Sequence, residues 1–301
     1  MKKAIIISGP TASGKSALAL HMAAWQDIAI INADALQIYQ GLPILSSQPS
    51  ADEKKSVPHF LYSHFSCTQS CSVGLWLELV KSKLEKIWNQ NKLPIIVGGS
   101  GMYISKLLDG ISQIPEIEES LKMEARELAK NLNREEIIKI LSDLGEDLEK
   151  IKDLDKQRLS RSYEVLKQTQ KSIFWWQKQE AKKIIDTTNF VHLNLEPERQ
   201  KLYQNCNNRF EIMLKNGAIE EAEALIKAGV ESDAQITKTL GFLEIQDFLQ
   251  QKITKEKMIE ISSQKTRNYA KRQLTWFRHQ FADKKTFDNL KSAAEFLKNF
   301  K

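Results

Sequence analysis

Short apolar runs separated by helical patterns make up the first third of the chain. The runs at Ala4–Ser8, Ile28–Asn32 and Pro94–Gly98 are rich in β-branched residues and are bounded by Gly, Asn or Pro, which is typical of buried strands. Between them, Ser16–Ala24 and Val73–Trp88 carry apolar residues at three- and four-residue spacing, the period of an amphipathic helix. Strands that alternate with helices predict a parallel sheet with helices packed on its faces.

The middle of the chain has a different pattern. Across residues 116–183 the spacing of apolar residues is almost entirely helical, and no strand candidate occurs. A fourth strand candidate, Phe190–Leu195, then returns the chain to the sheet before a C-terminal third that is again helical. We therefore predict a core made of residues 1–112 and 186–301, interrupted by an all-helical insertion at 113–185.

Charge is distributed unevenly along the chain, which carries 44 Lys and Arg against 38 Asp and Glu, a net charge of +6. Residues 116–149 hold 11 acidic and 5 basic side chains, whereas 152–183 hold 9 basic and 4 acidic, and 265–285 hold 7 basic and 1 acidic. Each run fits a solvated helix face; the two basic runs also fit surfaces for a phosphate-rich polymer, because aromatic side chains are interleaved with the charges. These aromatics are Tyr163, Phe174, Trp175, Trp176, Tyr269, Trp276 and Phe277. Two interpretations of Trp175 and Trp176 are open: they lie in the core, or they form a surface on which bases stack.

Composition excludes several classes of protein. Hydrophobic residues make up 42% and charged residues 27%, near globular averages, which argues against disordered, collagen-like and coiled-coil chains. The longest apolar runs are far shorter than the roughly 20 residues that cross a bilayer, so we expect no membrane span, and no cleavage pattern indicates a signal peptide. Cys67, Cys71 and Cys206 show neither paired spacing nor a His cluster, which argues against a disulfide scaffold or structural zinc and favours the reducing cytoplasm.

A phosphate-binding motif follows the first predicted strand. It fits G-x-x-x-x-G-K-[ST] and lies directly between a strand and a helical pattern, the context in which this motif forms a P-loop. Glycines let backbone N–H groups converge on phosphate oxygens, the helix N-terminus adds partial positive charge, the lysine supplies a cation and the serine a Mg²⁺ ligand. An ordinary glycine-rich turn is the alternative. The motif consists of Gly9, Pro10, Thr11, Ala12, Ser13, Gly14, Lys15 and Ser16.

Two further turns fall at the predicted carboxyl edge of the sheet. Asp34 comes just after the second strand, where ligands of open α/β sheets bind, so its carboxylate can act as a base or a metal ligand. The alternative is that Asp34 caps the N-terminus of a following helix. Residues 98–103 add a flexible turn rich in N–H donors after the third strand. Together these features predict an α/β fold, a P-loop core with a parallel sheet flanked by helices, plus an all-helical insertion domain.

Eight segments, spread over nearly the whole chain, carry a family resemblance. They are GPTASGKS (Gly9–Ser16), INADALQIYQGL (Ile31–Leu42), QPS (Gln48–Ser50), VPH (Val57–His59), GGSGMY (Gly98–Tyr103), DLDKQRLSRSYEV (Asp153–Val165), NRFEIMLKNGAIEEA (Asn208–Ala222) and TRNYAKRQLTWFR (Thr266–Arg278). With these segments in this order, the chain resembles the bacterial tRNA dimethylallyltransferases, the isopentenyltransferases that modify the adenosine next to the anticodon.

The resemblance implies an activity and its ligands. A member of this family transfers a dimethylallyl group from dimethylallyl diphosphate to N6 of the adenosine 3′-adjacent to the anticodon in tRNA, and releases diphosphate. Mg²⁺ is the implied cofactor. The implied partner is the anticodon stem-loop of tRNA, gripped by the helical insertion, with the target adenine swung into a channel through the protein; we expect a monomer.

Matching the motifs residue by residue assigns roles to named positions. Asp34 matches the general base of the family, Thr11–Ser16 match its diphosphate cradle, with Ser16 as the metal ligand, and Arg209 matches an arginine near the diphosphate. For Lys271, Arg272 and Arg278, tRNA contact and support of the P-loop side are both open. The positions that match tRNA contacts are Asp34, Ala35, Leu36, Gln37, Ser100, Lys122, Gln157, Arg158, Leu159, Ser160 and Arg161.

The chain departs from the family pattern at a few positions. Ala35 replaces the usual Ser after the base, Ser100 replaces Thr, and Phe60 replaces a second His after His59. Ser46-Ser47-Gln48 stands where Thr-Ala-Lys is usual, so that a lysine is lost. The lost lysine bears on local contacts and not on the reaction, and the effects of Ala35 and of Ser46-Ser47-Gln48 are left open.

Other functions fit part of the pattern. A prenyltransferase acting on free AMP or ADP and a kinase of small metabolites share the P-loop, but a mononucleotide substrate needs no second basic domain with Arg158 and Arg161. An RNA-binding NTPase switch would need nucleotide turnover, and the sequence has no convincing Walker-B run of four apolar residues ending in a metal-binding acid.

Overall fold

The chain folds into two compact units. The structure, a computed structural model, describes residues 2–185, 189–281 and 283–299. One unit, called the core unit below, comprises residues 1–108 and 184–301; the other, called the helical unit, comprises 109–183.

The observed boundaries of the helical unit differ by a few residues from the predicted 113–185. The cause is an antiparallel bridge between the entering and leaving segments: the Ile111 N–H donates to the Lys182 carbonyl at 3.1 Å, and the Lys182 N–H donates back at 3.0 Å. Both segments therefore belong to the helical unit. The predicted start of the second core segment, residue 186, lies outside the described residues.

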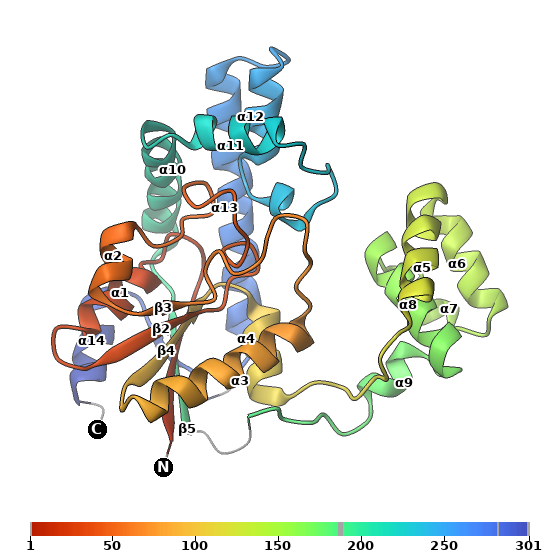
Figure 1. Cartoon of the computed structure of the whole chain (residues 1–301), viewed down its shortest axis with the longest axis horizontal. Helices are drawn as coiled ribbons and strands as arrows, with labels where there is room; N and C mark the ends of the chain where they lie inside the picture. The colour runs from red at the N-terminus through yellow and green to blue at the C-terminus, as the bar shows by residue number, and fades with distance from the viewer. Residues whose placement is uncertain (1, 186–188, 282, 300–301) are drawn as a thin grey trace. The chain divides into compact units, whose positions relative to one another are not determined.

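A six-stranded parallel sheet in the order β3-β2-β4-β1-β5-β6 forms the centre of the core unit (Figure 1). The strands are β1 Lys3–Ser8, β2 Ile28–Asn32, β3 His59–Phe60, β4 Leu93–Gly98, β5 Asn189–Leu195 and β6 Lys285–Phe287. The four predicted strands are confirmed to within one residue at each end. The edge strands β3 and β6 were not predicted, because segments of two and three residues carry no periodic signal.

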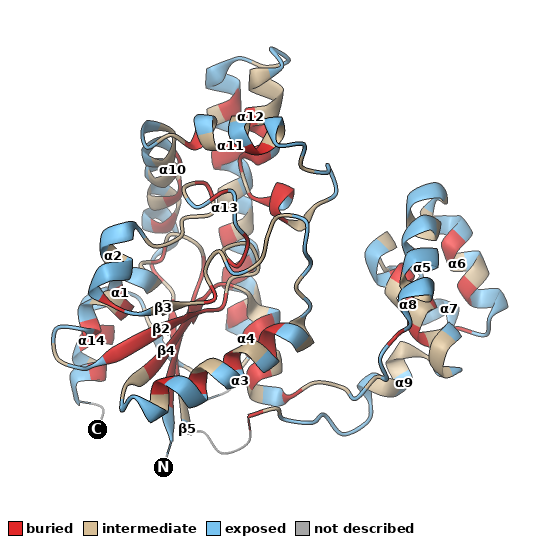
Figure 2. Ribbon diagram, viewed as in Figure 1, coloured by how far each residue is buried: buried red, intermediate tan, exposed pale blue. Residues whose placement is uncertain are grey.

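Helices cover both faces of this sheet. On one face Ile5 and Ile7 pack against Leu18 and Leu297 from the adjacent helices α1 and α14. On the other, the Trp76 indole of α3 stacks on Tyr103 of α4, with ring centroids 4.4 Å apart. Figure 2 shows buried residues along the strands and on the helix faces turned toward them. The helices of the core unit are α1 Lys15–Met22, α2 Ala51–Ser56, α3 Val73–Asn89, α4 Gly101–Asp109, α10 Arg199–Lys215, α11 Ala218–Lys227, η1 Gln235–Lys238, α12 Phe242–Leu249, α13 Lys255–His279 and α14 Leu290–Asn299.

The helices α10 to α13 gather beyond the carboxyl ends of the strands (Figure 1). Leu202 and Cys206 of α10 pack with Ala270 and Leu274 of α13, and Ala12 of the P-loop lies against this cluster. Two long helices from the C-terminal third therefore reach the phosphate-binding loop, which the chain forms almost two hundred residues earlier.

The helical unit has a small core of its own. The helices are α5 Glu119–Asn131, α6 Arg134–Asp143, α7 Leu148–Ile151, α8 Lys156–Thr169 and α9 Ile173–Gln177. Ala125, Ile137, Leu141, Leu159 and Tyr163 form the centre of this core. The predicted all-helical insertion is confirmed in the described residues.

The tryptophan pair of α9 lies at the edge of this unit. Trp175 is 40% exposed, and the Lys171 ammonium lies 3.7 Å from the centroid of its ring. Trp176 is half-buried, and its indole N–H donates to the Thr169 hydroxyl at 3.0 Å. Trp175 is therefore a surface residue and not part of the core.

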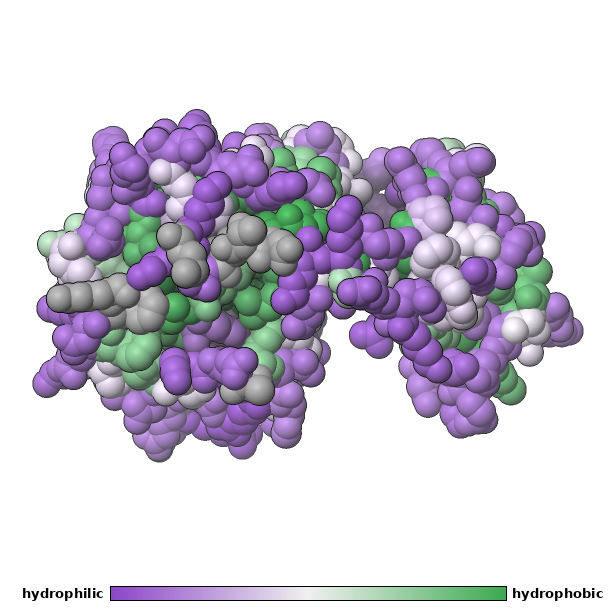
Figure 3. Space-filling view, turned by 90° about the horizontal axis from the view of Figure 1, so that it is seen from below, coloured by the Kyte–Doolittle hydropathy of each residue, from purple (hydrophilic) through white to green (hydrophobic). Residues whose placement is uncertain are grey.

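Hydrophilic residues predominate on the face that Figure 3 shows. Every helix in the described ranges is too short or too polar to cross a membrane.

Candidate active site

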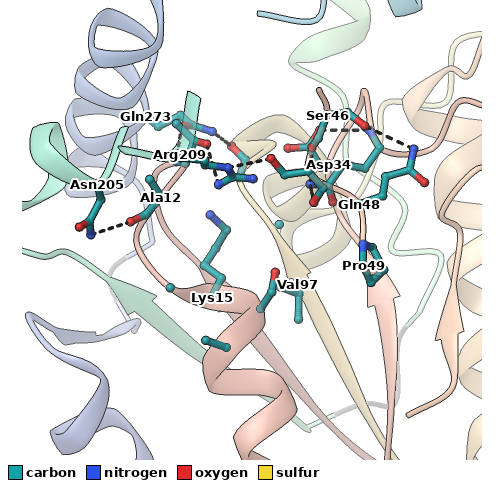
Figure 4. A pocket seen from close by; sticks show the side chains of 18 of the residues that line it. Ala12, Lys15, Asp34, Ser46, Gln48, Pro49, Val97, Asn205, Arg209 and Gln273 are labelled. Carbon is teal, nitrogen blue, oxygen red and sulfur yellow. Dashed lines mark hydrogen bonds between the residues drawn. The ribbon is translucent and has the colours of Figure 1, made fainter. Parts of the chain in front are cut away.

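A cavity of about 530 Å³ opens at the carboxyl edge of the sheet. Its walls come from the P-loop, the turns after β2 and β4, and the helices α10 and α13. Figure 4 shows Lys15, Asp34 and Arg209, which point into this space from three different elements. The structure thus brings together three residues that the sequence analysis placed in one site.

The P-loop has the backbone conformation that its glycines allow. Gly9 has φ +144°, and a Cβ there would lie 2.5 Å from the Leu195 carbonyl oxygen, so no larger residue fits beside β5. The buried Ser13 hydroxyl has no hydrogen-bond partner among the described residues. This hydroxyl lies beside Gly9, where a Cβ would come within 3.0 Å of it, and Ser13 is not one of the residues that line the cavity.

Lys15 lines the cavity and, among the described residues, forms no ion pair with an acidic side chain. Its ammonium donates to the Pro10 carbonyl at 2.7 Å. Burial lowers the pKa of Lys15 to about 7, the Arg209 guanidinium also lowers it, and the Asp34 carboxylate opposes both. A bound diphosphate would supply the opposite charge that this ammonium lacks.

Asp34 is held by the turn in which it lies. Its Oδ1 accepts hydrogen bonds from the Leu36 N–H at 2.9 Å and the Gln37 N–H at 3.4 Å. The Asn32 side chain accepts from the Asp34 N–H at 2.8 Å and donates to the Asp34 carbonyl at 2.9 Å. Asp34 therefore caps a turn, not the predicted helix, while no hydrogen bond within the described residues occupies its Oδ2. Asp34 can cap the turn and still act as a base, because Oδ1 accepts from the turn N–H groups and Oδ2 is left for a substrate.

Arg209 reaches the cavity from α10. Its Nε donates to the Ser47 hydroxyl at 2.7 Å, and its Nη1 donates to the Thr11 hydroxyl at 3.3 Å. Burial lowers the pKa of this guanidinium, and the Asp34 carboxylate raises it. The remaining N–H groups of Arg209 are left for a ligand.

Three amide side chains that the sequence analysis did not single out support these groups. Gln273 of α13 accepts from the Thr11 N–H at 2.8 Å and donates to the Gly99 carbonyl at 2.9 Å. Asn205 of α10 donates to the Ala12 carbonyl at 3.2 Å. Asn32, described above, is the third. No local pattern marks Asn205 and Gln273, since their partners lie 193 and 262 positions away in sequence.

The remaining core-unit residues matched to tRNA contacts also brace the Asp34 turn. The Ser100 hydroxyl accepts from the Ala35 N–H at 2.9 Å. The Gln37 amide donates to the carbonyls of Ser46 at 2.9 Å and Ser47 at 3.0 Å. These bonds fix the loop that carries the carboxylate.

The other matched residues lie in the helical unit and form a separate group. Lys122 pairs with Glu119 at 3.1 Å on α5. On α8, Arg158 pairs with Asp155 at 3.6 Å and Arg161 with Glu164 at 2.6 Å, while Gln157 is exposed. Leu159 and Ser160 are buried in the core of the unit, and the Ser160 hydroxyl donates to the Ala125 carbonyl. The prediction of RNA contact by this segment therefore rests on Gln157, Arg158 and Arg161.

The three basic residues of α13 whose roles were left open have different surroundings. Arg278 forms an ion pair with Glu196, in the segment between β5 and α10. Lys271 is exposed. Arg272 lines a second cavity of about 220 Å³, whose walls include Leu45, Phe210 and Leu240. Thr11, Asp34, Arg209 and Tyr269 line both cavities, so the two cavities adjoin.

A metal ion would find hard oxygen donors here, but no complete set. In the described parts of the chain no group of three or more His, Cys, Asp or Glu is placed to hold a metal. The exposed Ser16 hydroxyl and the Asp34 carboxylate line the same cavity. Mg²⁺ commonly takes only one or two protein oxygens and completes its shell with phosphate oxygens and water, so the donors present fit this ion.

Comparison with known proteins places this site in a family. The family model described as IPP transferase matches residues 37–280, and a model described as isopentenyl transferase matches residues 2–62. The tRNA dimethylallyltransferase of Ehrlichia chaffeensis is 40% identical over 99% of this chain and 98% of its own length. That of Rickettsia bellii is 40% identical over 95% of this chain and 91% of its own length.

Two solved structures are similar over most of the chain. The tRNA isopentenylpyrophosphate transferase of Bacillus halodurans superposes with a TM-score of 0.71 at 28% identity, covering 100% of this chain and 95% of its own. A eukaryotic dimethylallyltransferase acting on tRNA gives a TM-score of 0.71 at 25% identity, covering 92% of this chain and 70% of its own. Agreement of this extent in both sequence and structure shows that the chain belongs to the tRNA dimethylallyltransferases, the IPP transferase family.

Proposed function

We propose that this protein transfers the dimethylallyl group of dimethylallyl diphosphate to N6 of the adenosine 3′-adjacent to the anticodon in tRNA, and releases diphosphate. The observation that carries the proposal is one cavity lined by P-loop groups, two cations and a carboxylate with an open Oδ2. Its occurrence in a chain of this family supports the choice of substrate.

The P-loop side of the cavity suits the leaving group. An allylic diphosphate ionises readily because the developing cation at C1 is delocalised, so the protein must chiefly stabilise the departing diphosphate. Lys15, Arg209 and the loop N–H groups supply positive charge and donors for it.

The charge balance of the cavity favours a divalent cation as a further ligand. Among the described residues of its lining, the charged side chains are Lys15, Arg209, Asp34 and Glu53, so the two signs cancel before the diphosphate arrives. Ser16 is the side chain that would hold Mg²⁺ together with the diphosphate oxygens. When bound, the ion would neutralise negative charge that develops on the leaving group.

Asp34 is the group suited to activate the acceptor. The exocyclic N6 of adenine is a poor nucleophile because its lone pair is delocalised into the ring. A carboxylate that orients this amine and removes its proton contributes roughly 10²- to 10⁴-fold to the rate. The turn that engages Oδ1 of Asp34 leaves Oδ2 in a fixed direction for this task.

The second cavity suits the five-carbon group and the base. Leu45, Phe210 and Leu240 offer an apolar wall next to Arg209, where an allylic cation would be kept from water. The acceptor adenine must leave its stack to reach this place, and a base in a single-stranded loop is the cheapest to extrude. We assign contacts with tRNA phosphates to Arg158 and Arg161 of the helical unit.

Mass analysis of tRNA nucleosides tests the proposal. Unmodified tRNA is incubated with the protein, dimethylallyl diphosphate and Mg²⁺, and its nucleosides are compared with those from the Asp34→Asn variant. A mass gain of one dimethylallyl group on adenosine, lost in the variant, is the expected result. Labelling of free AMP in place of tRNA would move the protein to the prenyltransferases of free nucleotides, and ATP hydrolysis stimulated by RNA would move it to the NTPase switches.

We infer that the reaction takes place in the cytoplasm. A tRNA acceptor and three cysteines that are free thiols support a cytoplasmic location.

A further inference from the structure

We propose that Ser47 is a positioning residue that holds the Arg209 guanidinium toward the leaving diphosphate and away from the Asp34 carboxylate. The inference rests on the proposed function, and it adds a role for a side chain that the motifs leave unassigned. The observation behind it is the 2.7 Å hydrogen bond from Arg209 Nε to the Ser47 hydroxyl, between residues 162 positions apart.

Ser47 is itself held firmly. Its backbone has φ +59°, a left-handed conformation that costs free energy for any residue other than glycine. Its N–H donates to the Ile44 carbonyl at 2.9 Å, and its carbonyl accepts from the Gln37 amide at 3.0 Å. The hydroxyl is therefore presented from a fixed point in the loop. Fixed loops of this kind are suited to orienting a longer and more flexible side chain.

The bond to Ser47 fixes the plane of the Arg209 guanidinium. The Nε–H donates to Ser47 and one N–H of Nη1 donates to Thr11, and two contacts at different positions of the planar group fix its orientation. Among the described residues no hydrogen bond occupies the N–H groups of Nη2, so they remain available to acceptor-rich ligands such as phosphate oxygens. Arg209 would then bind the diphosphate without first paying the entropy of choosing a rotamer.

The bond also prevents an unproductive ion pair. Arg209 and Asp34 line the same cavity, and the Asp34 carboxylate acts on the charge of Arg209, yet no ion pair joins them in the described residues. A free guanidinium would be attracted to that carboxylate. Such pairing would occupy the base and remove a cation from the diphosphate at the same time.

Two substitutions separate the hydroxyl from the backbone conformation. Ser47→Ala removes the hydrogen-bond acceptor and keeps the strained backbone. Ser47→Gly also removes the acceptor but suits a φ of +59°, so it should not lower the unfolding temperature. Ser56→Ala is the control, because it removes an exposed hydroxyl at the end of α2 that donates to the Glu53 carbonyl at 2.9 Å and lines neither cavity.

The first measurement is the binding of inorganic diphosphate with Mg²⁺ by calorimetry, which needs no turnover. We expect both Ser47 variants to bind roughly tenfold more weakly than the native protein, the scale of one hydrogen bond to a charged group. The Ser56→Ala variant should bind like the native protein. In the transfer assay, kcat should fall in both Ser47 variants while the Kd for tRNA stays unchanged.

A double-mutant cycle identifies the partner. Arg209→Lys removes Nε, so in that background Ser47→Ala should cost nothing further in diphosphate affinity. If the cost of Ser47→Ala persists there, or if Ser47→Gly binds diphosphate like the native protein, the proposal is wrong and Ser47 serves only the turn. If the native protein transfers no dimethylallyl group while the Ser47 variants still lose diphosphate affinity, the proposed function fails and the positioning role stands.

Discussion

The two units hold their charged residues in different ways. In the core unit, the cavity groups are tied by hydrogen bonds between residues far apart in sequence, as from Arg209 to Ser47 and from Thr11 to Gln273. In the helical unit, Arg158 and Arg161 pair with acids three residues away in sequence, Asp155 and Glu164. The hydrogen bonds of the core unit fix the positions of the cavity groups, as a chemical reaction requires. The ion pairs of the helical unit are weak, so their arginines can bind a phosphate in place of the acidic side chain.

The comparison predicts that substitutions in the core unit act on rate and substitutions in the helical unit on affinity. The largest effect is expected for Asp34→Asn, which keeps the shape of the side chain and its caps while removing the base. We expect kcat to fall roughly 10²-fold or more, with tRNA affinity nearly unchanged. Single-turnover measurement at saturating tRNA checks this. Asp52→Asn, on the exposed helix α2, is the control; near-normal turnover by Asp34→Asn would contradict the assignment.

Lys15→Ala and Ser16→Ala come next in expected size. Lys15→Ala removes a charge-assisted contact, so the KM for dimethylallyl diphosphate should rise roughly tenfold or more. Ser16→Ala removes a metal ligand, so the Mg²⁺ concentration needed for activity should rise roughly tenfold or more. Titration of each ligand at saturating tRNA measures this. A loss of tRNA affinity alone would show instead that the P-loop binds a tRNA phosphate.

The lowered pKa of Lys15 predicts a pH dependence of diphosphate binding. In the free protein this pKa is about 7, and a bound diphosphate raises it by pairing with the ammonium. Affinity should therefore be greatest below pH 7 and fall as pH rises above it, because binding must then take up a proton. Calorimetry at pH 8 in buffers of different ionisation enthalpy should show an uptake of about one proton more for the native protein than for Lys15→Met. Equal uptake by the two would contradict the lysine assignment.

The smallest effects are expected in the helical unit. Arg158→Ala and Arg161→Ala should each weaken tRNA binding and reduce the magnitude of the slope of log K against log salt by roughly 0.7–0.9 per lost phosphate contact. The rate on bound tRNA should be unchanged. Lys227→Ala, which breaks an exposed ion pair of the core unit with Glu223, is the control. An unchanged slope in both arginine variants would leave these residues as surface ion pairs only.

The sequence was sufficient where the signal is local. The P-loop and the four central strands follow from runs of a few residues, and all were located closely. The same local logic could have corrected one prediction: Leu159 and Tyr163 are four apart on α8, the spacing of a buried helix face, so Leu159 belongs to the core.

The sequence was insufficient where a residue acts through a distant partner. Asn205 and Gln273 support the P-loop only because the fold brings α10 and α13 to the sheet edge. Ser47 appeared only as a departure from a motif, although its hydroxyl contacts Arg209. One amino-acid sequence by itself contains no pattern that indicates contacts between positions so far apart.

The bridge between Ile111 and Lys182 makes the helical unit a removable module. Since the chain leaves and returns through adjacent backbone positions, a short turn could connect these two residues in place of the whole unit. The ends of the insertion are already held together, so the core unit need not supply loop-closure entropy for the helices between them. An ancestral chain could therefore have acquired or exchanged this unit at one point of its surface while keeping its catalytic cavity, and with it the chemistry, unchanged.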